Sequence, residues 1–163
     1  MNPFARFVVV GDGKFLETMK LMTEVAGLSG VVTFTGALYG DDLVSLMRSF
    51  TALINTSLRY ESETFCIANV EAMALGVPVV SFGIGGVGEY LTHSENGLIV
   101  DSFDEAEGVA AAMAEQVVAL LYDEGNVNRD EIGKAAAGTV KVKKLEIQDL
   151  ATKYEELYEE LVW

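Results

Sequence analysis

The sequence contains few of the residues from which disulfides, metal centres and polyanion-binding surfaces are built. It has one cysteine, Cys66, and one histidine, His93, among 163 residues. A single cysteine excludes an internal disulfide and fits a reducing compartment, so we expect a cytoplasmic protein. Basic residues number 11 against 25 acidic ones, which gives a formal net charge of −14. This charge argues against nucleic acid or an anionic membrane surface as a partner.

Long hydrophobic segments are also missing. The sequence has no apolar run of about 18 residues, so nothing in it predicts a helix that spans a membrane. The first ten residues lack the longer apolar stretch and the cleavage site of a signal peptide. Hydrophobic residues nevertheless make up 50% of the chain. This content excludes a disordered polypeptide, and the length suffices for one domain with a core.

Short apolar runs alternate with segments of helical periodicity along most of the chain. We predict strands at residues 7–10, 31–35, 52–55, 77–82 and 97–100. We predict helices at about residues 15–26, 41–50, 66–75, 105–122 and 147–161. Within residues 131–144 we predict a helix followed by a mobile connection. This alternation predicts a Rossmann-like α/β fold, a parallel sheet with helices on both faces. We expect residues 1–122 to form this domain and residues 123–163 to form a helical extension of it.

The segment 61–89, ESETFCIANVEAMALGVPVVSFGIGGVGE, is the most informative part of the sequence. It reads as a loop, a helix, a short strand and a glycine-rich turn. The helix is apolar almost all round, yet Glu71 lies in its middle. Because charged groups are almost never buried without a partner, Glu71 should face a wet cleft or a ligand that donates hydrogen bonds. Gly76 and Pro78 end the helix.

The same segment resembles the donor-binding signature of retaining glycosyltransferases of the GT-B fold, family 4, which are related to sucrose, trehalose-phosphate and glycogen synthases. The matching pattern is E-T-F-C-x4-E-A-M-A-x-G-x-P-V-V, followed by G-G-x-x-E. Thr64 and Cys66 stand where the family usually has glycines. Glu61 competes with Glu63 as the first carboxylate, and the spacing of eight residues to Glu71 favours Glu63. The resemblance covers about residues 5–105 and resumes at the C-terminus.

The resemblance implies an enzyme that transfers a sugar from a nucleotide-diphosphate sugar to an unknown acceptor, with retention and without a cofactor or metal. It implies that Glu63 is the catalytic residue and contacts a hydroxyl of the donor sugar. It also implies that Glu71 binds the two ribose hydroxyls of the nucleotide. A carboxylate has two acceptor oxygens for such hydroxyls. The resemblance implies that the following residues also bind the donor: Thr64, Phe65, Cys66, Gly11, Gly13, Gly36, Ala37 and Leu38. The backbone of residues 36–38 is expected to recognise the base.

Parts of a complete family member have no counterpart in this chain. The resemblance implies a missing N-terminal acceptor-binding domain, through which any peripheral membrane contact would run. It also implies a missing first strand with a Gly-Arg turn and a lysine that neutralise the diphosphate. In a doubly wound sheet this strand would lie between strands 7–10 and 52–55. We therefore expect this chain alone to be inactive, and the alternative reading is a non-catalytic nucleotide-sugar-binding or partner-binding remnant.

Two weaker signals point to other kinds of site. Residues 83–88 fit G-x-G-x-x-G after a strand, but a dinucleotide fingerprint also needs an acidic residue about 20 positions on. Asp101 and Asp104 are too close for that role, and the G-G-x-x-E turn explains the glycines more simply. His93 lies in a polar turn with no second histidine in the chain, which argues against zinc.

Overall fold

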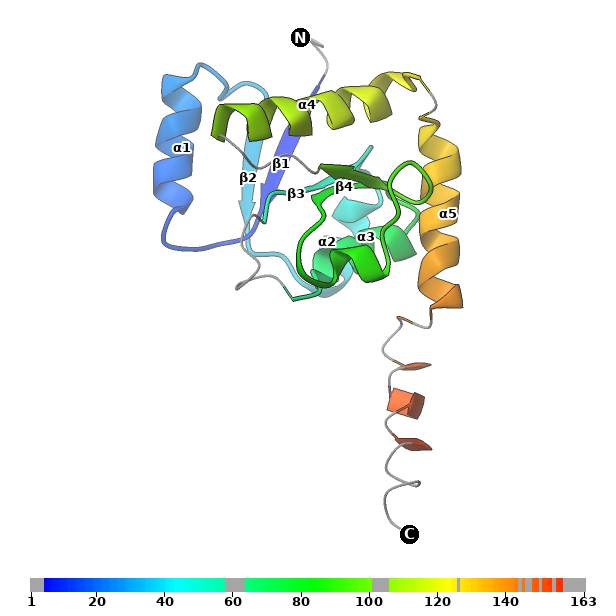
Figure 1. Ribbon diagram of the computed structural model, residues 1–163. Helices are drawn as coiled ribbons and strands as arrows, with labels where there is room; N and C mark the ends of the chain where they lie inside the picture. The colour runs from blue at the N-terminus through cyan, green and yellow to red at the C-terminus, as the bar shows by residue number, and fades with distance from the viewer. Residues whose placement is uncertain are drawn as a thin grey trace. The chain divides into compact units, whose positions relative to one another are not determined.

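The computed structural model describes residues 5–57, 64–100, 106–125, 127–143, 145, 148–149, 151–153 and 155–156. Helices and strands alternate in the predicted order (Figure 1). The elements are β1 Phe7–Val10, α1 Leu16–Val25, β2 Val32–Gly36, α2 Gly40–Met47, β3 Leu53–Asn55, α3 Ile67–Ala74, β4 Val79–Phe82, the 3₁₀-helix η1 Gly85–Glu89, β5 Leu98–Val100, α4 Ala106–Tyr122 and α5 Arg129–Val142. The predicted final helix lies largely outside the described residues. The helix η1 was not predicted.

The strands form two parallel sheets, which confirms the Rossmann-like α/β class. β1 pairs with β2, and its register shifts between Val9 and Val10. β3, β4 and β5 pair in that order in a second sheet. These are the pairings expected of a doubly wound sheet that has no strand between β1 and β3.

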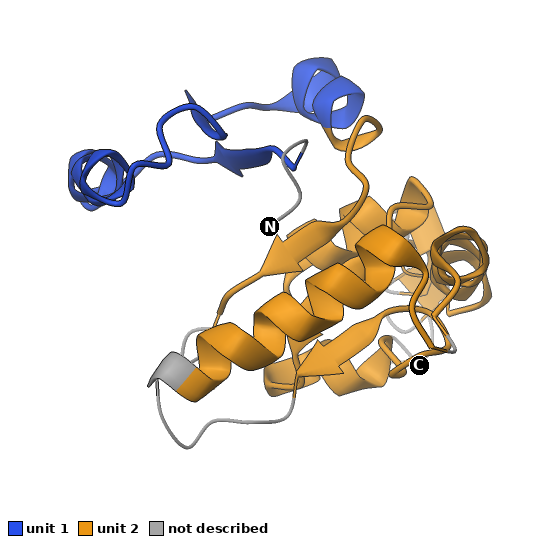
Figure 2. Cartoon of the chain, turned by 90° about the horizontal axis from the view of Figure 1, so that it is seen from above, with its two compact units in different colours: residues 1–46 blue, residues 47–163 orange. Residues whose placement is uncertain are grey.

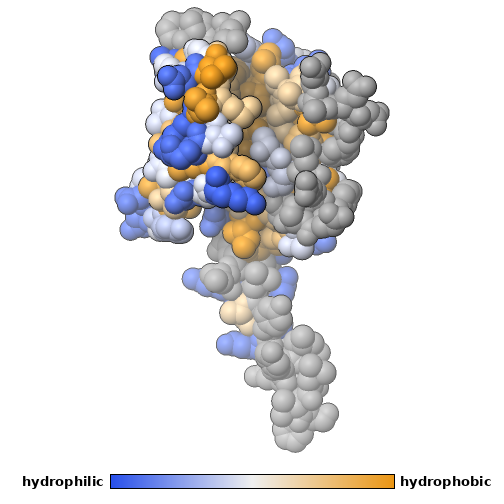
Figure 3. Space-filling model, turned by 90° about the vertical axis from the view of Figure 1, so that its left-hand side faces the viewer, coloured by the Kyte–Doolittle hydropathy of each residue, from blue (hydrophilic) through white to orange (hydrophobic). Residues whose placement is uncertain are grey.

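The chain divides into two compact units, residues 1–46 and residues 47–163 (Figure 2). The C-terminal extension predicted from residue 123 thus belongs to the second unit, in which α5 packs against α3. Within the described part of the first unit no residue is buried. Its helix α1 exposes large apolar side chains, including Met22 and Val25, the latter 81% exposed. Figure 3 shows apolar residues in orange on the surface of the molecule.

The core of the second unit lies on both faces of β4, whose four residues are all buried. Val79 belongs to a cluster that includes Met73 of α3 and Val140 of α5. Val80 and Phe82 belong to a second cluster with residues of α4 and β5. Successive side chains of a strand point to opposite faces, so β4 serves both clusters. Helices cover both faces of this sheet, as predicted.

Helix α3 ends as the sequence predicts. Gly76 has φ 74° and donates its N–H to the Met73 carbonyl at 2.9 Å, while Val77 donates to Ala72 at 2.9 Å. These two bonds form a Schellman motif, which requires the left-handed conformation that glycine adopts at low cost. The turn packs directly against α5, because a Cβ atom placed on Gly133 would overlap the Gly76 carbonyl oxygen. The two glycines therefore set how closely α5 approaches α3.

The close approach predicts opposite effects for two glycines of α5. Gly133→Ala should lower the free energy of unfolding by roughly 1–3 kcal/mol, because the added methyl group forces the two backbones apart. Gly138→Ala is the matched control: a Cβ atom there meets no atom within 4 Å. It should raise the free energy of unfolding by up to about 1 kcal/mol, since alanine favours a helix interior. Urea denaturation of both variants measures this, and equal effects would contradict the packing described.

Candidate functional site

Residues 64–66, which we call the site loop, lead into α3. Cys66 occupies the N-cap position of that helix with φ 50° and ψ 80°, in the left-handed region. This conformation costs a residue other than glycine about 1–3 kcal/mol and persists only where the surroundings enforce it. The structure therefore has to supply bonds that hold the site loop.

Three residues supply these bonds. The Gly86 N–H of η1 donates to the Thr64 carbonyl at 2.7 Å. The hydroxyl of Tyr90, just after η1, donates to the Phe65 carbonyl at 2.7 Å. Asn55, at the end of β3, donates from Nδ2 to Cys66 Sγ at 2.9 Å. Each residue of the site loop is thus fixed by a different partner.

The glycine at position 86 is required by space. A Cβ atom on Gly86 would lie 2.5 Å from the Thr64 carbonyl oxygen and 3.4 Å from the Phe65 ring. The Phe65 and Tyr90 rings pack edge to face, with centroids 5.0 Å apart. Such aromatic pairs add about 0.5–1.5 kcal/mol beyond the area that they bury. The G-G-x-x-E turn of the sequence therefore serves as the support of the site loop.

Behind Tyr90 lies a buried polar network that sequence analysis missed. Asn69 of α3 is fully buried and donates from Nδ2 to the Tyr90 hydroxyl at 3.1 Å and to Ser81 Oγ at 3.3 Å. Ser81 Oγ donates in turn to the Phe82 carbonyl at 3.1 Å. A signal for the network exists in the sequence, since Asn69 is the one uncharged polar residue among the apolar positions of α3.

Glu71 lies on the open face of α3. Its side chain is exposed, while its neighbours Ala72 and Met73 are fully buried. The same open face carries Ile67, which is 69% exposed, and Ala68. A helix that is apolar almost all round is normally buried, but this face of α3 is exposed. Among the described residues Glu71 is open to solvent, and its position in a cleft and its contact with a ribose stay predictions.

The remaining predicted site residues lie in the first unit or outside the described residues. Gly11 and Gly36 meet at the carboxyl ends of β1 and β2, where Gly11 N–H donates to the Gly36 carbonyl at 2.8 Å. Their φ angles of 137° and 72° favour glycine. Gly13 follows Gly11 in the same turn, while Ala37 is exposed and Leu38 half-buried.

Glu63 and its competitor Glu61 lie outside the described residues. The prediction that Glu63 and Glu71 face one cleft therefore stays a prediction. Glu71 and the site loop belong to the second unit, whereas Gly11, Gly13, Gly36, Ala37 and Leu38 belong to the first.

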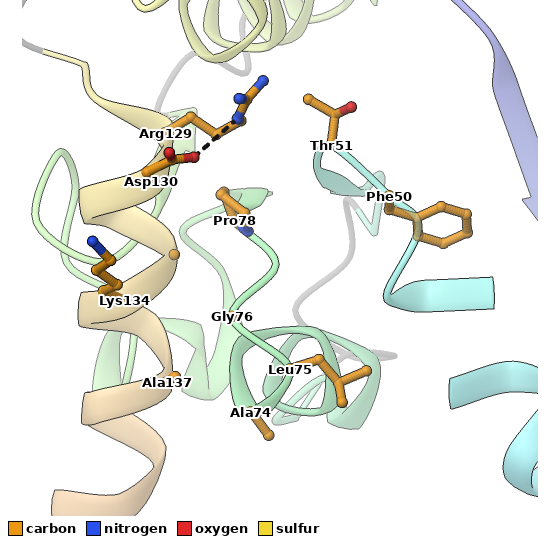
Figure 4. A pocket seen from close by; sticks show the side chains of 11 residues that line it. Phe50, Thr51, Ala74, Leu75, Gly76, Pro78, Arg129, Asp130, Lys134 and Ala137 are labelled. Carbon is orange, nitrogen blue, oxygen red and sulfur yellow. Dashed lines mark ion pairs between the residues drawn. The ribbon is translucent and has the colours of Figure 1, made fainter. Parts of the chain in front are cut away.

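A groove of about 610 Å³ lies elsewhere in the second unit (Figure 4). Its lining includes Thr51 and Pro78, which come just before β3 and β4, so it opens at the amino ends of these strands. Arg129 and Asp130 form an ion pair of 3.6 Å at its rim. Ligands of open α/β sheets bind beyond the carboxyl ends of the strands. We therefore take the site loop and Glu71, and not this groove, as the candidate site.

The described side chains include no group of three His, Cys, Asp or Glu residues that could hold a metal ion. His93 Nδ1 accepts a hydrogen bond from the Ile99 N–H at 3.0 Å, which gives this histidine a role in closing its turn. Within the described parts of the chain, no helix combines the length and apolar character needed to cross a membrane.

The support of the site loop predicts a contrast between two glycines of η1. Gly86→Ala should lower the free energy of unfolding by about 1–3 kcal/mol, because its methyl group collides with a backbone oxygen that cannot rotate away. Gly88→Ala is the control, because a Cβ atom at position 88 meets no atom within 4 Å. This substitution should change the free energy of unfolding by less than about 0.5 kcal/mol. Thermal denaturation of both proteins gives the comparison. A Gly86→Ala protein as stable as the control would show that the site loop is not held by this contact.

Comparison with known proteins connects this site to a family. Residues 1–117 match the family described as "Glycosyl transferases group 1". A mannosyltransferase of Mycobacterium tuberculosis, named as GDP-mannose-dependent alpha-(1-6)-phosphatidylinositol monomannoside mannosyltransferase, is 35% identical over 118 residues, 70% of this chain. The 2-deoxystreptamine glucosyltransferase of Streptomyces kanamyceticus is 32% identical over 72% of this chain. The chain spans 30% and 28% of the length of these two relatives.

Solved structures agree on the fold. Sucrose-phosphate synthase from Thermosynechococcus elongatus superposes with a TM-score of 0.82 at 23% identity, over 99% of this chain and 39% of its own. The Anabaena protein Alr3699/HepE, solved in complex with UDP-glucose, superposes with a TM-score of 0.70 at 24% identity, over 94% of this chain and 42% of its own. The family match covers residues 1–117, which is more than half of the chain. The chain belongs to the glycosyl transferases group 1 family.

Proposed function

We propose that this chain is the donor-binding part of a glycosyltransferase, which transfers a sugar from a nucleotide-diphosphate sugar to an acceptor with retention of configuration. The observation that carries the proposal is the pairing of an exposed Glu71 with a site loop held in a strained conformation just before it. Both lie in the segment that the family signature covers. An open carboxylate beside an enforced loop is suited to a polar ligand with hydroxyl groups.

In this proposal Glu71 holds the ribose of the nucleotide. Its two carboxylate oxygens accept hydrogen bonds from the adjacent hydroxyls, and a charge-assisted bond of this kind contributes about 1.5–3 kcal/mol. The N-terminus of α3, which follows the site loop, favours a negative charge and so suits the diphosphate. Glu63 would contact the donor sugar. The base would lie against the backbone of residues 36–38 of the first unit.

The choice of a nucleoside diphosphate rests on the relatives. One of them is named as dependent on GDP-mannose, and a structural neighbour was solved with UDP-glucose. In the transfer step negative charge develops on the departing diphosphate, and preorganised positive groups stabilise it. This chain carries a net charge of −14, so we propose that cations outside it supply that stabilisation. The proposal requires no metal and no cofactor, and the acceptor would bind a further domain.

A second candidate is a nucleotide-sugar-binding remnant without catalysis. The division of the strands into two sheets favours it, because β1 and β3 are not joined by a ladder in the described residues. Both candidates bind the donor at the same place. They separate in a transfer assay with the protein that contains this chain, since only the enzyme releases free nucleoside diphosphate from the donor.

The ribose contact predicts the effect of removing one carboxylate. Glu71→Ala should weaken the binding of UDP or GDP about tenfold, because one charge-assisted hydrogen-bonding group is lost. Glu115→Ala provides the control, since Glu115 is also an exposed glutamate on a helix, α4, and the net charge changes by the same amount. Isothermal titration calorimetry measures both. Equal affinities of the Glu71→Ala and Glu115→Ala proteins would reject the role of Glu71.

A further inference from the structure

Tyr90 stands between the core of the second unit and the site loop. Its side chain is 1% exposed, and its ring packs against Phe65. From these contacts the geometry points to Tyr90 and Asn69 as a positioning pair: Asn69 orients the Tyr90 hydroxyl, and this hydroxyl sets the backbone of the site loop for nucleotide binding. The effect on binding rests on the function proposed above, whereas the effect on the loop does not.

The direction of each hydrogen bond follows from the donors present. A phenol has one proton to donate and lone pairs that accept. Two carbonyls lie near the Tyr90 oxygen, Phe65 at 2.7 Å and Cys66 at 3.5 Å, and the shorter contact takes the proton. The Asn69 Nδ2 group donates to the same oxygen at 3.1 Å. The Tyr90 oxygen therefore accepts a hydrogen bond from Asn69, and the Tyr90 hydroxyl proton remains available for the Phe65 carbonyl of the site loop.

The tyrosine is itself anchored independently of the loop. Its carbonyl accepts from Asn96 Nδ2 at 2.9 Å, and the same Nδ2 donates to Thr139 Oγ1 of α5 at 2.8 Å. Its N–H donates to the Val87 carbonyl at 3.2 Å. Tyr90 is thus a fixed group against which the loop is held, and the loop does not need to hold the tyrosine.

Holding the loop affects binding because the conformation at Cys66 is unfavourable by itself. A loop that already has its bound shape loses less conformational freedom when a ligand arrives, and this raises affinity. If the hydroxyl is removed, the Phe65 carbonyl loses its donor and Cys66 can relax from φ 50°. Affinity for the nucleotide should then fall, although neither Tyr90 nor Asn69 contacts it.

The test uses Tyr90→Phe, which keeps the ring against Phe65 and removes only the hydroxyl. Amide hydrogen exchange of Gly86, whose N–H donates to the Thr64 carbonyl, should become at least about tenfold faster, while amides of α4 keep their rates. The dissociation constant for UDP or GDP should rise about five- to tenfold. Leu120→Val is the structural control, because Leu120 is buried in the cluster on the other face of the sheet. It should lower the melting temperature without changing either quantity.

Two further variants distinguish a loss of positioning of the site loop from a general destabilisation of the fold. As a single substitution, Asn69→Ala should weaken nucleotide binding. In the Tyr90→Phe background it should cause no further loss of affinity, since Asn69 acts through the Tyr90 hydroxyl. Cys66→Gly should restore part of the affinity lost in Tyr90→Phe, because glycine adopts a positive φ without the steric penalty that cysteine has there.

The outcomes distinguish this inference from the proposed function. Gly86 exchange in Tyr90→Phe that rises no more than in α4 would overturn the positioning role, whatever happens to binding. If the wild-type protein binds neither UDP nor GDP, the proposed function fails, and the exchange of Gly86 alone then decides whether Tyr90 positions the loop. A loss of affinity in Leu120→Val equal to that in Tyr90→Phe would also overturn it.

Discussion

The backbone of Cys66 takes a conformation that an isolated chain would avoid, and the second unit is arranged so that this conformation persists. A residue other than glycine in the left-handed region costs about 1–3 kcal/mol, a sizeable share of a typical domain stability of roughly 5–15 kcal/mol. The bonds that hold it come from β3, from η1 and from Tyr90. The site loop thus depends on the fold of the sheet and is not a property of its own sequence.

The polar network behind the loop carries a cost of its own. Asn69 lies fully buried beside apolar residues of α3, and its Oδ1 atom has no hydrogen-bond partner among the described residues. A buried acceptor without a donor costs about 1–3 kcal/mol. Replacing this asparagine by an apolar residue would look favourable if packing alone mattered. A buried polar group kept despite that cost fits a site where local stability is given up for a defined geometry.

Much of the fold was predictable because its signals are local. The β1 and α3 boundaries, the glycine cap at Gly76 and the parallel α/β class all follow from apolar periodicity and from glycine and proline positions. Glu71 could be singled out for the same reason, since a charge among apolar neighbours is visible in the sequence. The division of the chain at residue 46 depends on which strands pair, so periodicity along the sequence does not predict it.

The support of the site loop could not be predicted in this way. Tyr90 lies 25 residues from Phe65, and the bond between them forms only when η1 brings the chain back beside α3. Asn69 and Ser81 are likewise twelve residues apart and meet across two different elements. Pairings of this kind depend on tertiary packing, and the hydrophobic periodicity of the sequence does not predict them. The sequence therefore locates the candidate site, while the structure shows what makes it rigid.

We propose that the site loop and Glu71 bind the nucleotide part of the sugar donor. The most direct measurement is a titration of the isotope-labelled protein with UDP or GDP, followed through the NMR chemical shifts of its backbone amides. We expect the largest changes on residues 64–71. Changes confined to the groove at Thr51, Pro78 and Arg129, with the site loop unaffected, would contradict it.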